Sequence, residues 1–284
     1  MKESNEIMTV VIGKRSNLSV ELHKRLKNVD LLSSNSLLES MAQLEKYREK
    51  KVNVVFNNFQ SSSQLKSYIK PSFYIDVSIS ITVEILMYLI NNNVIIQKII
   101  YTSSSSVYGN SLAADEDSQP HPDNIPSTLK YLNEQFLTQI CSQHDLNLTI
   151  ARVFNMYGGN DHFSIIQKIH NCYVNNEILT VLNNGSSVRD FIHVKNVVDI
   201  YEKLLLNPSI KINILNVGSG IGRSISQIIR KLSERGHYID VCNGGAYKEI
   251  PFSKANVSKL QGIVDTTSFV VVDEYLVRKN MDFV

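Results

Sequence analysis

The sequence predicts an α/β fold with a parallel β-sheet, and three observations support this prediction. Short β-rich runs alternate with helical patterns over the first half of the chain. The chain has 284 residues, of which 43% are apolar, which is enough for one large domain or for a main domain with a smaller appendage. After residue 155 the alternation becomes less regular. Strands that alternate with helices imply crossover connections, so we expect a doubly wound, Rossmann-like sheet with ligands beyond the carboxyl ends of its strands.

The elements of the first half follow in a regular order. Apolar, β-rich runs predict strands at residues 6–13, 51–58, 95–103 and 146–155. Helical patterns occupy residues 18–26, 81–92 and 129–144. In the first helix, Leu18, Leu22 and Leu26 form one apolar stripe, which is typical of a helix packed on a sheet.

The second half predicts a smaller, mixed part. Helices are expected at residues 163–174, 194–205 and 225–236, and a strand that ends in a loop at residues 211–220. We therefore divide the chain into a Rossmann-like domain, 1–155, and a mainly substrate-binding part, 156–284. The boundary has no obvious linker, so the two parts should share a core, with residues of about 185–215 as candidates to return to the main sheet.

Composition and charge narrow the class of protein. The 29 basic and 27 acidic residues give a net charge of +2, which argues against nucleic acid or an anionic membrane as the main partner. The three cysteines, Cys141, Cys172 and Cys242, are far apart, so neither a metal site nor a disulfide framework is expected. The N-terminal segment MKESNEIMTVVIG does not resemble a signal peptide, and no apolar run of transmembrane length is visible. We expect a cytoplasmic protein.

The first strand runs into a turn that departs from a dinucleotide-binding pattern. Such a turn uses G-x-x-G-x-x-G so that the backbone can approach a pyrophosphate at the helix N-terminus. Gly13 supplies the first glycine, but Ser16 and Ser19 occupy the other two places. The alternative is an ordinary turn with Ser16 or Asn17 as the helix cap. Binding of NAD or NADP is therefore only weakly supported by this segment.

Five later blocks carry a resemblance to a known family. KIIYTSSSSVYG, RVFNMYGGND and SSVRDFIHVKNVVDIY resemble blocks of the extended short-chain dehydrogenase/reductases that act as nucleotide-sugar epimerases, dehydratases and reductases. INILNVGSGIGRSISQII and PFSKANVSKLQG are similar to the next two blocks of that family. The resemblance covers residues 9–262 in a single order.

The resemblance implies a catalytic serine and a catalytic lysine. Ser104, five residues before Gly109, matches the serine or threonine that hydrogen-bonds the reacting sugar oxygen. Lys130 matches the lysine of the family's Tyr-x-x-x-Lys signature, and it also matches a residue that contacts the cofactor. The 22-residue separation of Lys130 from Arg152 is typical of relatives and supports this register.

In this register the catalytic tyrosine is replaced by Pro126. In the family the tyrosine moves the hydroxyl proton while hydride passes to or from nicotinamide. Proline has no acidic proton, so that transfer cannot occur at this position, whereas its ring suits the first turn of a helix. Together with the altered glycine turn, this replacement impairs two parts of the redox apparatus.

The resemblance also implies a substrate-binding set, which is better preserved. Its members are Ser105, Tyr108, Asn155, Arg189 and Lys254. Asn155 matches the contact to the diphosphate region, and the planar guanidinium of Arg189 suits the paired oxygens of a phosphate. For Tyr108 a packing role, and for Lys254 a solvated surface position, are the alternatives. Asp190 is expected to orient nearby backbone, and an ordinary turn residue is the alternative.

Several groups could replace the missing proton donor. Asp161 and His162 follow MYGGN on a loop expected near the sugar, and we rank them first. Other candidates in or beside the matched blocks are Tyr108, Tyr131, Tyr157 and His193. Lys130 could act as an acid or on a cofactor ribose.

Three functions remain open at this point. The first is a redox-neutral isomerase of a dTDP- or UDP-linked (6-deoxy)hexose, for example one that interconverts pyranose and furanose forms. The second is an NAD(P)-dependent 4-epimerase or 4-keto reductase with a relocated proton donor. The third is a non-catalytic sensor that binds a nucleotide sugar or a dinucleotide, because fold alone does not determine function. The resemblance implies bacterial surface-polysaccharide synthesis (O-antigen or capsule) and a homodimer formed through helices 82–92 and 130–144.

Overall fold

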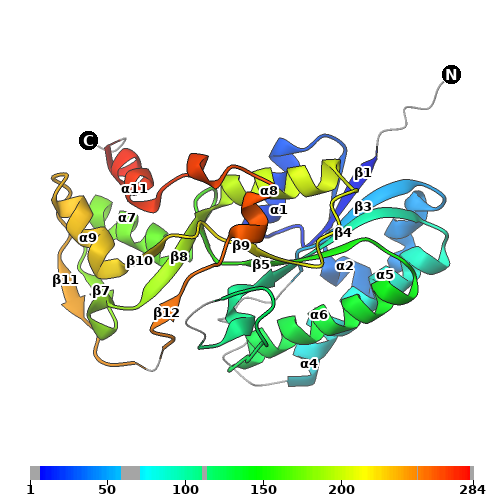
Figure 1. Cartoon of the computed structure of the whole chain (residues 1–284), viewed down its shortest axis with the longest axis horizontal. Coiled ribbons are helices and arrows are strands. Elements are labelled where there is room, and N and C mark those ends of the chain that lie inside the picture. Colours follow the sequence, from blue (N-terminus) through cyan, green and yellow to red (C-terminus); the bar gives the residue numbers. More distant parts are fainter. Residues whose placement is uncertain (1–6, 59–70, 111–113, 248, 282–284) are drawn as a thin grey trace. The chain divides into compact units, whose positions relative to one another are not determined.

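The computed structural model describes residues 7–58, 71–110, 114–247 and 249–281, so Glu6, the first residue of the predicted first strand, lies outside the described part. The chain forms two compact units. Unit 1 comprises Met1–Val107, Pro122–Arg152 and Val198–Leu215. Unit 2 comprises Tyr108–His121, Val153–Val197 and Asn216–Val284. Figure 1 labels the elements of both.

The main sheet confirms the predicted fold class. It is a parallel sheet of six strands in the order β2-β1-β3-β4-β5-β9. The strands are β1 (Met8–Ile12), β2 (Val29–Leu32), β3 (Lys51–Phe56), β4 (Ile95–Ser104), β5 (Leu148–Val153) and β9 (Ile214–Val217). Most of their side chains are buried, as expected for a parallel sheet covered on both faces.

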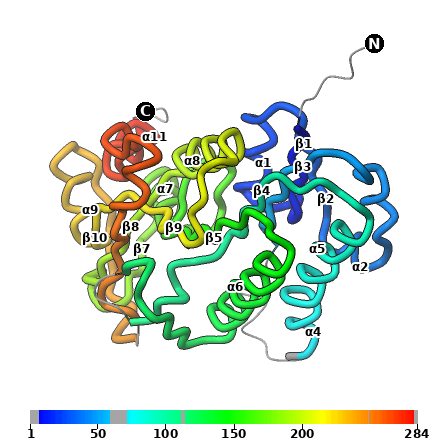
Figure 2. Tube along the Cα trace, turned by 45° about the vertical axis from the view of Figure 1, so that its right-hand side comes forward, coloured from blue at the N-terminus to red at the C-terminus, as the bar shows by residue number. Residues whose placement is uncertain are grey.

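Helices cover both faces of this sheet. α1 (Asn17–Arg25) and α8 (Val194–Leu206) lie on one face, where Arg25 Nε donates to Glu202 at 3.0 Å. The opposite face carries α2 (Ser34–Glu39), the 3₁₀ helix η1 (Met41–Tyr47), α5 (Ile81–Asn91) and α6 (Ile125–Gln143). α5 and α6 run side by side (Figure 2). α4 (Pro71–Ile75) and the π-helix η2 (Asp76–Ser80) lead into α5, and the 3₁₀ helix η3 (Ser105–Tyr108) follows β4.

The helical run Ser72–Asn91 is long and apolar enough to cross a membrane by length and composition. Half of its most apolar window, however, is buried inside the structure. Ile81, Ile85, Leu86 and Leu89 belong to the core cluster of unit 1. The apolar character of this run is therefore explained by packing against the main sheet.

Unit 2 is a mixed structure around a four-stranded sheet. In that sheet β10 (Gly222–Ser224), β8 (Val188–His193) and β12 (Phe252–Ser253) are neighbours, and β6 (Asn155–Tyr157) also pairs with β8. A separate ribbon pairs β7 (Leu179–Val181) with β11 (Val241–Asn243). The helices are α7 (Ile165–Asn175), η4 (Asn183–Gly185), α9 (Ile225–Ser233), α10 (Ser258–Gln261), η5 (Thr266–Ser268) and α11 (Val272–Met281).

The single strand predicted for residues 146–155 is two strands. β5 ends at Val153 in the main sheet, and β6 begins at Asn155 and pairs with β8. Between them, Phe154 N donates to Val217 O at 2.9 Å. β5 is buried throughout and β6 is half-buried, and the hydrophobic pattern carries no sign of the change of sheet between them.

Candidate functional site

The carboxyl end of β4 carries the predicted catalytic serine. Ser104 is half-buried, and its Oγ accepts hydrogen bonds from Ser106 N at 3.2 Å and from Ser106 Oγ at 3.0 Å. The next residue, Ser105, is half-buried at the start of η3. The Ser104 hydroxyl is thus oriented by the turn that follows it and keeps its own proton for a further acceptor.

Lys130 projects from α6 toward the same strand. Its Nζ donates to Thr102 O at 3.1 Å and lies 5.8 Å from the centre of the Tyr101 ring. Burial lowers the pKa of Lys130 to about 8, and the nearby charge of Glu134 opposes this shift. An ammonium group with this pKa is a competent proton donor near neutral pH.

Pro126 lies in the first turn of α6, as its ring geometry predicts. Asn124 is the N-cap: its side chain accepts from Ser127 N at 3.0 Å, and Asn124 N donates to the Ser127 hydroxyl oxygen at 3.3 Å. This capping box satisfies helix N–H groups without any contribution from residue 126. Pro126 is therefore an integrated part of the helix start.

A buried charged cluster behind Ser104 was missed by the sequence analysis. The carboxylate of Glu134 accepts from Arg152, with Nη2 to Oε2 at 2.7 Å, and from the hydroxyl of Ser103. Both charged side chains are at most 2% exposed. Glu134 lies four residues after Lys130, one helical turn further on, so the pair holds the lysine helix against β4 and β5.

The dinucleotide-type turn has become a serine-capped helix start. Ser16 is the N-cap of α1, and its Oγ accepts from Ser19 N at 3.1 Å. The amide of Asn57, just beyond β3, hydrogen-bonds Ser16 and, at 2.8 Å, Ser19. Gly13 has a φ of 112°, and a Cβ there would lie 2.3 Å from Asn57 O. These contacts do not fit the open glycine turn that a pyrophosphate needs.

In unit 2, the carboxylate of Asp190 holds the loops near Arg189, the predicted phosphate-binding residue. It accepts from Ser219 N and Oγ, both at 2.7 Å, from Gly220 N at 2.9 Å and from Ala255 N at 3.1 Å. Asp190 is fully buried; burial raises its pKa, and the donors of Ser219, Ala255 and Gly220 oppose the rise. The expectation that Asp190 orients backbone is confirmed.

Arg189 is engaged by an acid that the sequence analysis did not single out. Its Nη2 lies 2.9 Å from Glu249 Oε2, and its Nη1 donates to Val188 O. Ser187 Oγ, at 2.6 Å, and Asn183 Nδ2, at 2.9 Å, hold the other oxygen of Glu249. Burial lowers the pKa of Arg189, against the opposing effect of Glu249. The guanidinium is thus held in a fixed orientation.

Two further candidates of the substrate-binding set also have protein partners. Asn155 Nδ2 donates to Asp190 O at 3.2 Å. Tyr108 is buried, and its hydroxyl donates to Asn216 Oδ1 at 2.7 Å. Asn216 in turn donates to Ala114 O at 2.8 Å. These contacts give Tyr108 a structural role in unit 2, whereas Lys254 is exposed.

The acid/base candidates differ in their surroundings. Asp161 accepts from Phe163 N at 2.9 Å, from Ser164 N at 3.0 Å and from the Ser164 hydroxyl, and it thereby fixes the turn before α7. His162 is exposed beside it. Tyr157 is buried and donates to Val270 O at 2.9 Å, with the ring of His193 packed edge-on against it at 5.1 Å.

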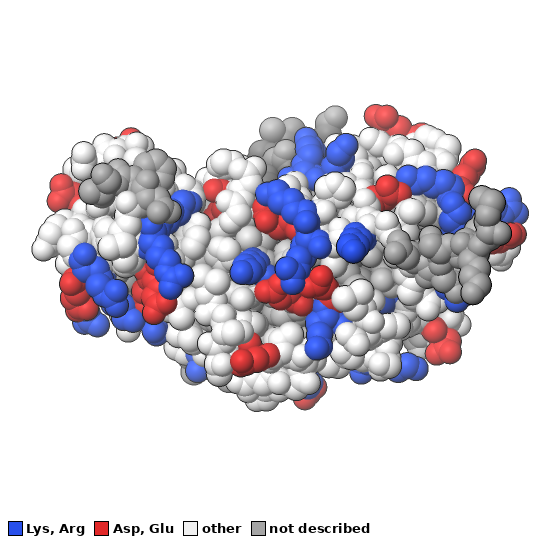
Figure 3. Space-filling view, turned by 90° about the horizontal axis from the view of Figure 1, so that it is seen from above, with Lys and Arg blue, Asp and Glu red and all other residues white. Residues whose placement is uncertain are grey.

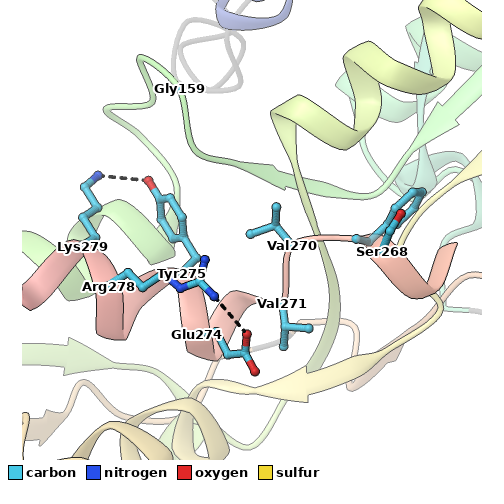
Figure 4. A pocket seen from close by; sticks show the side chains of 9 residues that line it. Gly159, Ser268, Val270, Val271, Glu274, Tyr275, Arg278 and Lys279 are labelled. Atoms are coloured by element: carbon cyan, nitrogen blue, oxygen red, sulfur yellow. Dashed lines mark hydrogen bonds and ion pairs between the residues drawn. The ribbon is translucent and has the colours of Figure 1, made fainter. Parts of the chain in front are cut away.

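A pocket of about 520 Å³ lies in unit 2 between Gly159 and α11 (Figure 4). On one side Lys279 donates to the Tyr275 hydroxyl at 3.2 Å, and Arg278 lies 3.9 Å from Glu274. None of the site residues predicted from the sequence lines this pocket. It is therefore separate, within unit 2, from the cluster around Arg189.

Comparisons with known proteins agree with this architecture. The sequence model of the NAD dependent epimerase/dehydratase family matches residues 2–218. The chain is 30% identical over 178 residues to Protein CapI of Staphylococcus aureus, a match that covers 61% of this chain and 52% of CapI. It therefore spans about half of the length of that relative. It is 26% identical over 258 residues to a UDP-glucose 4-epimerase of Mycoplasma genitalium, covering 81% of this chain and 74% of that protein.

The fold is shared with solved structures of low sequence identity. MoeE5 in complex with UDP-glucose and NAD has a TM-score of 0.83 and 19% identity, and the match covers 97% of this chain and 98% of that chain. At this identity the likeness shows the fold alone.

Proposed function

Because this chain belongs to the NAD dependent epimerase/dehydratase family, we propose that it acts on a nucleotide sugar, as a redox-neutral isomerase of a dTDP- or UDP-linked (6-deoxy)hexose. The observation that carries this proposal is Pro126, which lies in a capped first turn of the helix that bears Lys130. In the register of the resemblance, Pro126 takes the place of the family's tyrosine and offers no acidic proton, while the lysine and the serine remain.

Interconversion of pyranose and furanose forms fits this set of groups. The bond from C1 to the O5 ring oxygen breaks, a bond from C1 to O4 forms, the O4 hydroxyl loses its proton and O5 gains one. No electrons are gained or lost, so the reaction needs proton transfer and a fixed substrate but no hydride acceptor.

The proposed roles follow from the surroundings of each group. In unit 1, Ser104 hydrogen-bonds a sugar oxygen, and Lys130, with its pKa lowered to about 8, serves as the acid. In unit 2, Arg189 and Asn155 hold the diphosphate region, and Asp161 and His162 are the further acid/base candidates. Ser105 and Lys254 complete the proposed substrate contacts, whereas Tyr108 is buried and paired with Asn216.

Proton NMR of nucleotide sugars, with and without NAD(P)H, tests the reaction. We expect the wild-type protein to change the spectrum of a dTDP- or UDP-6-deoxyhexose without added nicotinamide.

Ser104→Ala should lower kcat roughly 100-fold, because a positioned proton-handling group contributes about 10²–10⁴-fold. Arg189→Ala should raise KM about tenfold, as expected when a charge-assisted phosphate contact is lost. Arg230→Ala, at an exposed arginine of the same unit, should change neither constant.

A strict requirement for NAD(P)H in the same assay would contradict the isomerase and support a second candidate. This candidate is an NAD(P)-dependent 4-epimerase or 4-keto reductase with a relocated proton donor. The relative from Mycoplasma genitalium favours it, because that protein is named a UDP-glucose 4-epimerase. Binding of nucleotide sugars without any turnover would instead support a non-catalytic sensor.

We further propose that the protein works in the cytoplasm in the synthesis of a bacterial surface polysaccharide. The support is the similarity to CapI.

We also propose a homodimer that forms through α5 and α6. The support is that α6 exposes two large apolar side chains one helical turn apart, Leu132 at 39% and Phe136 at 47%.

A further inference from the structure

A dinucleotide-binding turn must offer unpaired backbone N–H groups at the start of its helix. The pyrophosphate oxygens accept hydrogen bonds from these groups and gain from the positive end of the helix dipole. Glycines in the turn allow the backbone to come close to the ligand. Each N–H group of the turn between β1 and α1 can therefore be checked for a partner within the chain.

Four backbone N–H groups of this turn already have partners within unit 1. Gly13 N and Lys14 N both donate to Leu32 O, at 2.9 and 3.1 Å. Ser16 N donates to Gly13 O at 3.1 Å, and Ser19 N donates to Ser16 Oγ at 3.1 Å. The Ser16 hydroxyl oxygen thus takes the place at the helix N-terminus that a phosphate oxygen would need.

The side chains of Ser16, Ser19 and Asn57 also hydrogen-bond to one another across this turn. Ser16 Oγ donates to Ser19 Oγ at 3.0 Å, and the Asn57 amide bonds both hydroxyl groups. Ser19 and Asn57 are almost completely buried, at 0% and 2% exposed. The two hydrogens of Asn57 Nδ2 serve the two hydroxyl oxygens, whereas Asn57 Oδ1 is buried without a hydrogen-bond partner among the described residues.

Gly13, the glycine that remains in the turn, lies close to the backbone of Asn57. A Cβ on Gly13 would lie 2.3 Å from Asn57 O and 2.6 Å from Asn57 C. The position therefore requires glycine because the backbone beyond β3 passes close to it.

Dinucleotide-binding folds carry an acid at the end of the second strand that binds the ribose hydroxyl groups, and no acid follows β2 directly in this chain. Ser33, the N-cap of α2, directly follows β2. The nearest acid, Asp30, lies within β2 and is paired with the Tyr47 hydroxyl at 2.7 Å and with Lys46 Nζ at 2.8 Å. A ribose would have to displace these partners to reach the carboxylate.

We propose that the Ser16–Ser19–Asn57 cluster closes the dinucleotide turn, so that this member of an NAD-dependent family holds no resident NAD(H) or NADP(H). The proposal rests on unit 1 alone. It does not depend on which nucleotide sugar the protein uses or on whether the protein turns one over.

Direct binding measurements test it. Wild-type protein, purified without added cofactor, is denatured, and the released nucleotides are separated and quantified. In parallel, NADH and NADPH are titrated against the protein by fluorescence and by equilibrium dialysis. We expect far less than one nicotinamide dinucleotide per chain and a Kd above about 1 mM. Stoichiometric release, or a micromolar Kd, would overturn the proposal.

A variant without the blocking side chains tests whether NADH binding can be gained. In Ser16→Gly/Ser19→Gly/Asn57→Ala the blocking hydroxyl and amide groups are absent, and we expect at least tenfold tighter binding of NADH. Ser40→Gly removes a serine cap far from this turn in the sequence, at the start of η1, and should bind NADH no better than wild type. Circular dichroism checks that each variant is folded, and Ser16→Gly alone serves if the triple variant is not.

A folded open variant that binds no more tightly than wild type would show that the cluster does not close the site. No turnover is measured in these experiments. Failure of this proposal therefore leaves the isomerase test unaffected, and failure of the isomerase test leaves this one unaffected.

Discussion

Two lysine side chains of unit 1 show how burial lowers the pKa of an amine. Lys98 is fully buried on β4, where its Nζ donates to Asn147 Oδ1 at 2.8 Å and to Ile210 O at 2.9 Å. Burial lowers its pKa to about 8, the same value as for Lys130. Lys98 was not noticed in the sequence, because a lysine within an apolar run gives no sign of whether its amine reaches water.

The pKa of Lys98 predicts a change of stability with pH. In the unfolded chain a lysine amine keeps its proton up to about pH 10.5, whereas in the folded protein it loses it near pH 8. Between these values the unfolded state binds more protons, so the free energy of unfolding should rise with pH, by at most about 1.4 kcal/mol per pH unit for each such group. Urea unfolding at pH 8.0 and 9.5 measures this slope.

Lys98→Met should lower the stability at both pH values, because two buried acceptors lose their donor, and should clearly reduce the slope. Lys24→Met, at an exposed lysine of α1, should keep the wild-type slope. An unchanged slope in Lys98→Met would contradict the shifted pKa.

At the scale of elements, α6 combines local signals with long-range contacts. The sequence predicted that Pro126 lies in the first turn of the helix that carries Lys130, although the apolar pattern begins only near residue 129. The structure begins the helix at Ile125 because Asn124 and Ser127 cap it. The Glu134–Arg152 pair could not be foreseen, because the two residues are brought together only when α6 packs on β5.

The cap of α6 supports a quantitative prediction. Asn124→Ala should lower the free energy of unfolding by about 1 kcal/mol, the typical value of an N-cap side chain. Guanidinium chloride unfolding measures this difference. Thr128→Ala removes a neighbouring exposed hydroxyl that donates to Asn124 O but caps no N–H group, and should change stability by less than about 0.5 kcal/mol. Equal effects of the two substitutions would argue against the capping role.

For the whole molecule, the distribution of charged and apolar side chains on the surface indicates which kinds of partner can bind. Lysine and arginine side chains are interspersed with acidic ones on the face drawn in Figure 3, in keeping with the net charge of +2. α6, which exposes Leu132 and Phe136, runs beside α5 (Figure 2). A symmetric dimer would bury them, because equivalent helices of two copies can pack on each other.

The proposed dimer predicts the effect of a charge on α6. Phe136→Glu should convert the protein from a dimer to a monomer in light scattering after size-exclusion chromatography, because two carboxylates would be buried without partners. Phe163→Glu is the matched control: Phe163 is 97% exposed but lies in unit 2, before α7, and its replacement should leave the dimer intact. A monomeric wild-type protein, or a Phe136→Glu dimer, would contradict the proposal.

The α/β architecture and the family could be predicted from the sequence, because they depend on residue identity and on periods along the chain; that Pro126 replaces the family's proton donor stays a prediction. Only the tertiary structure decided that Ser16, Ser19 and Asn57 pair with one another, that Glu249 holds Arg189 and that Glu134 meets Arg152. Each of these contacts joins residues from different elements. A side chain's partner depends on which strands and helices become neighbours, and a local sequence pattern does not contain that information.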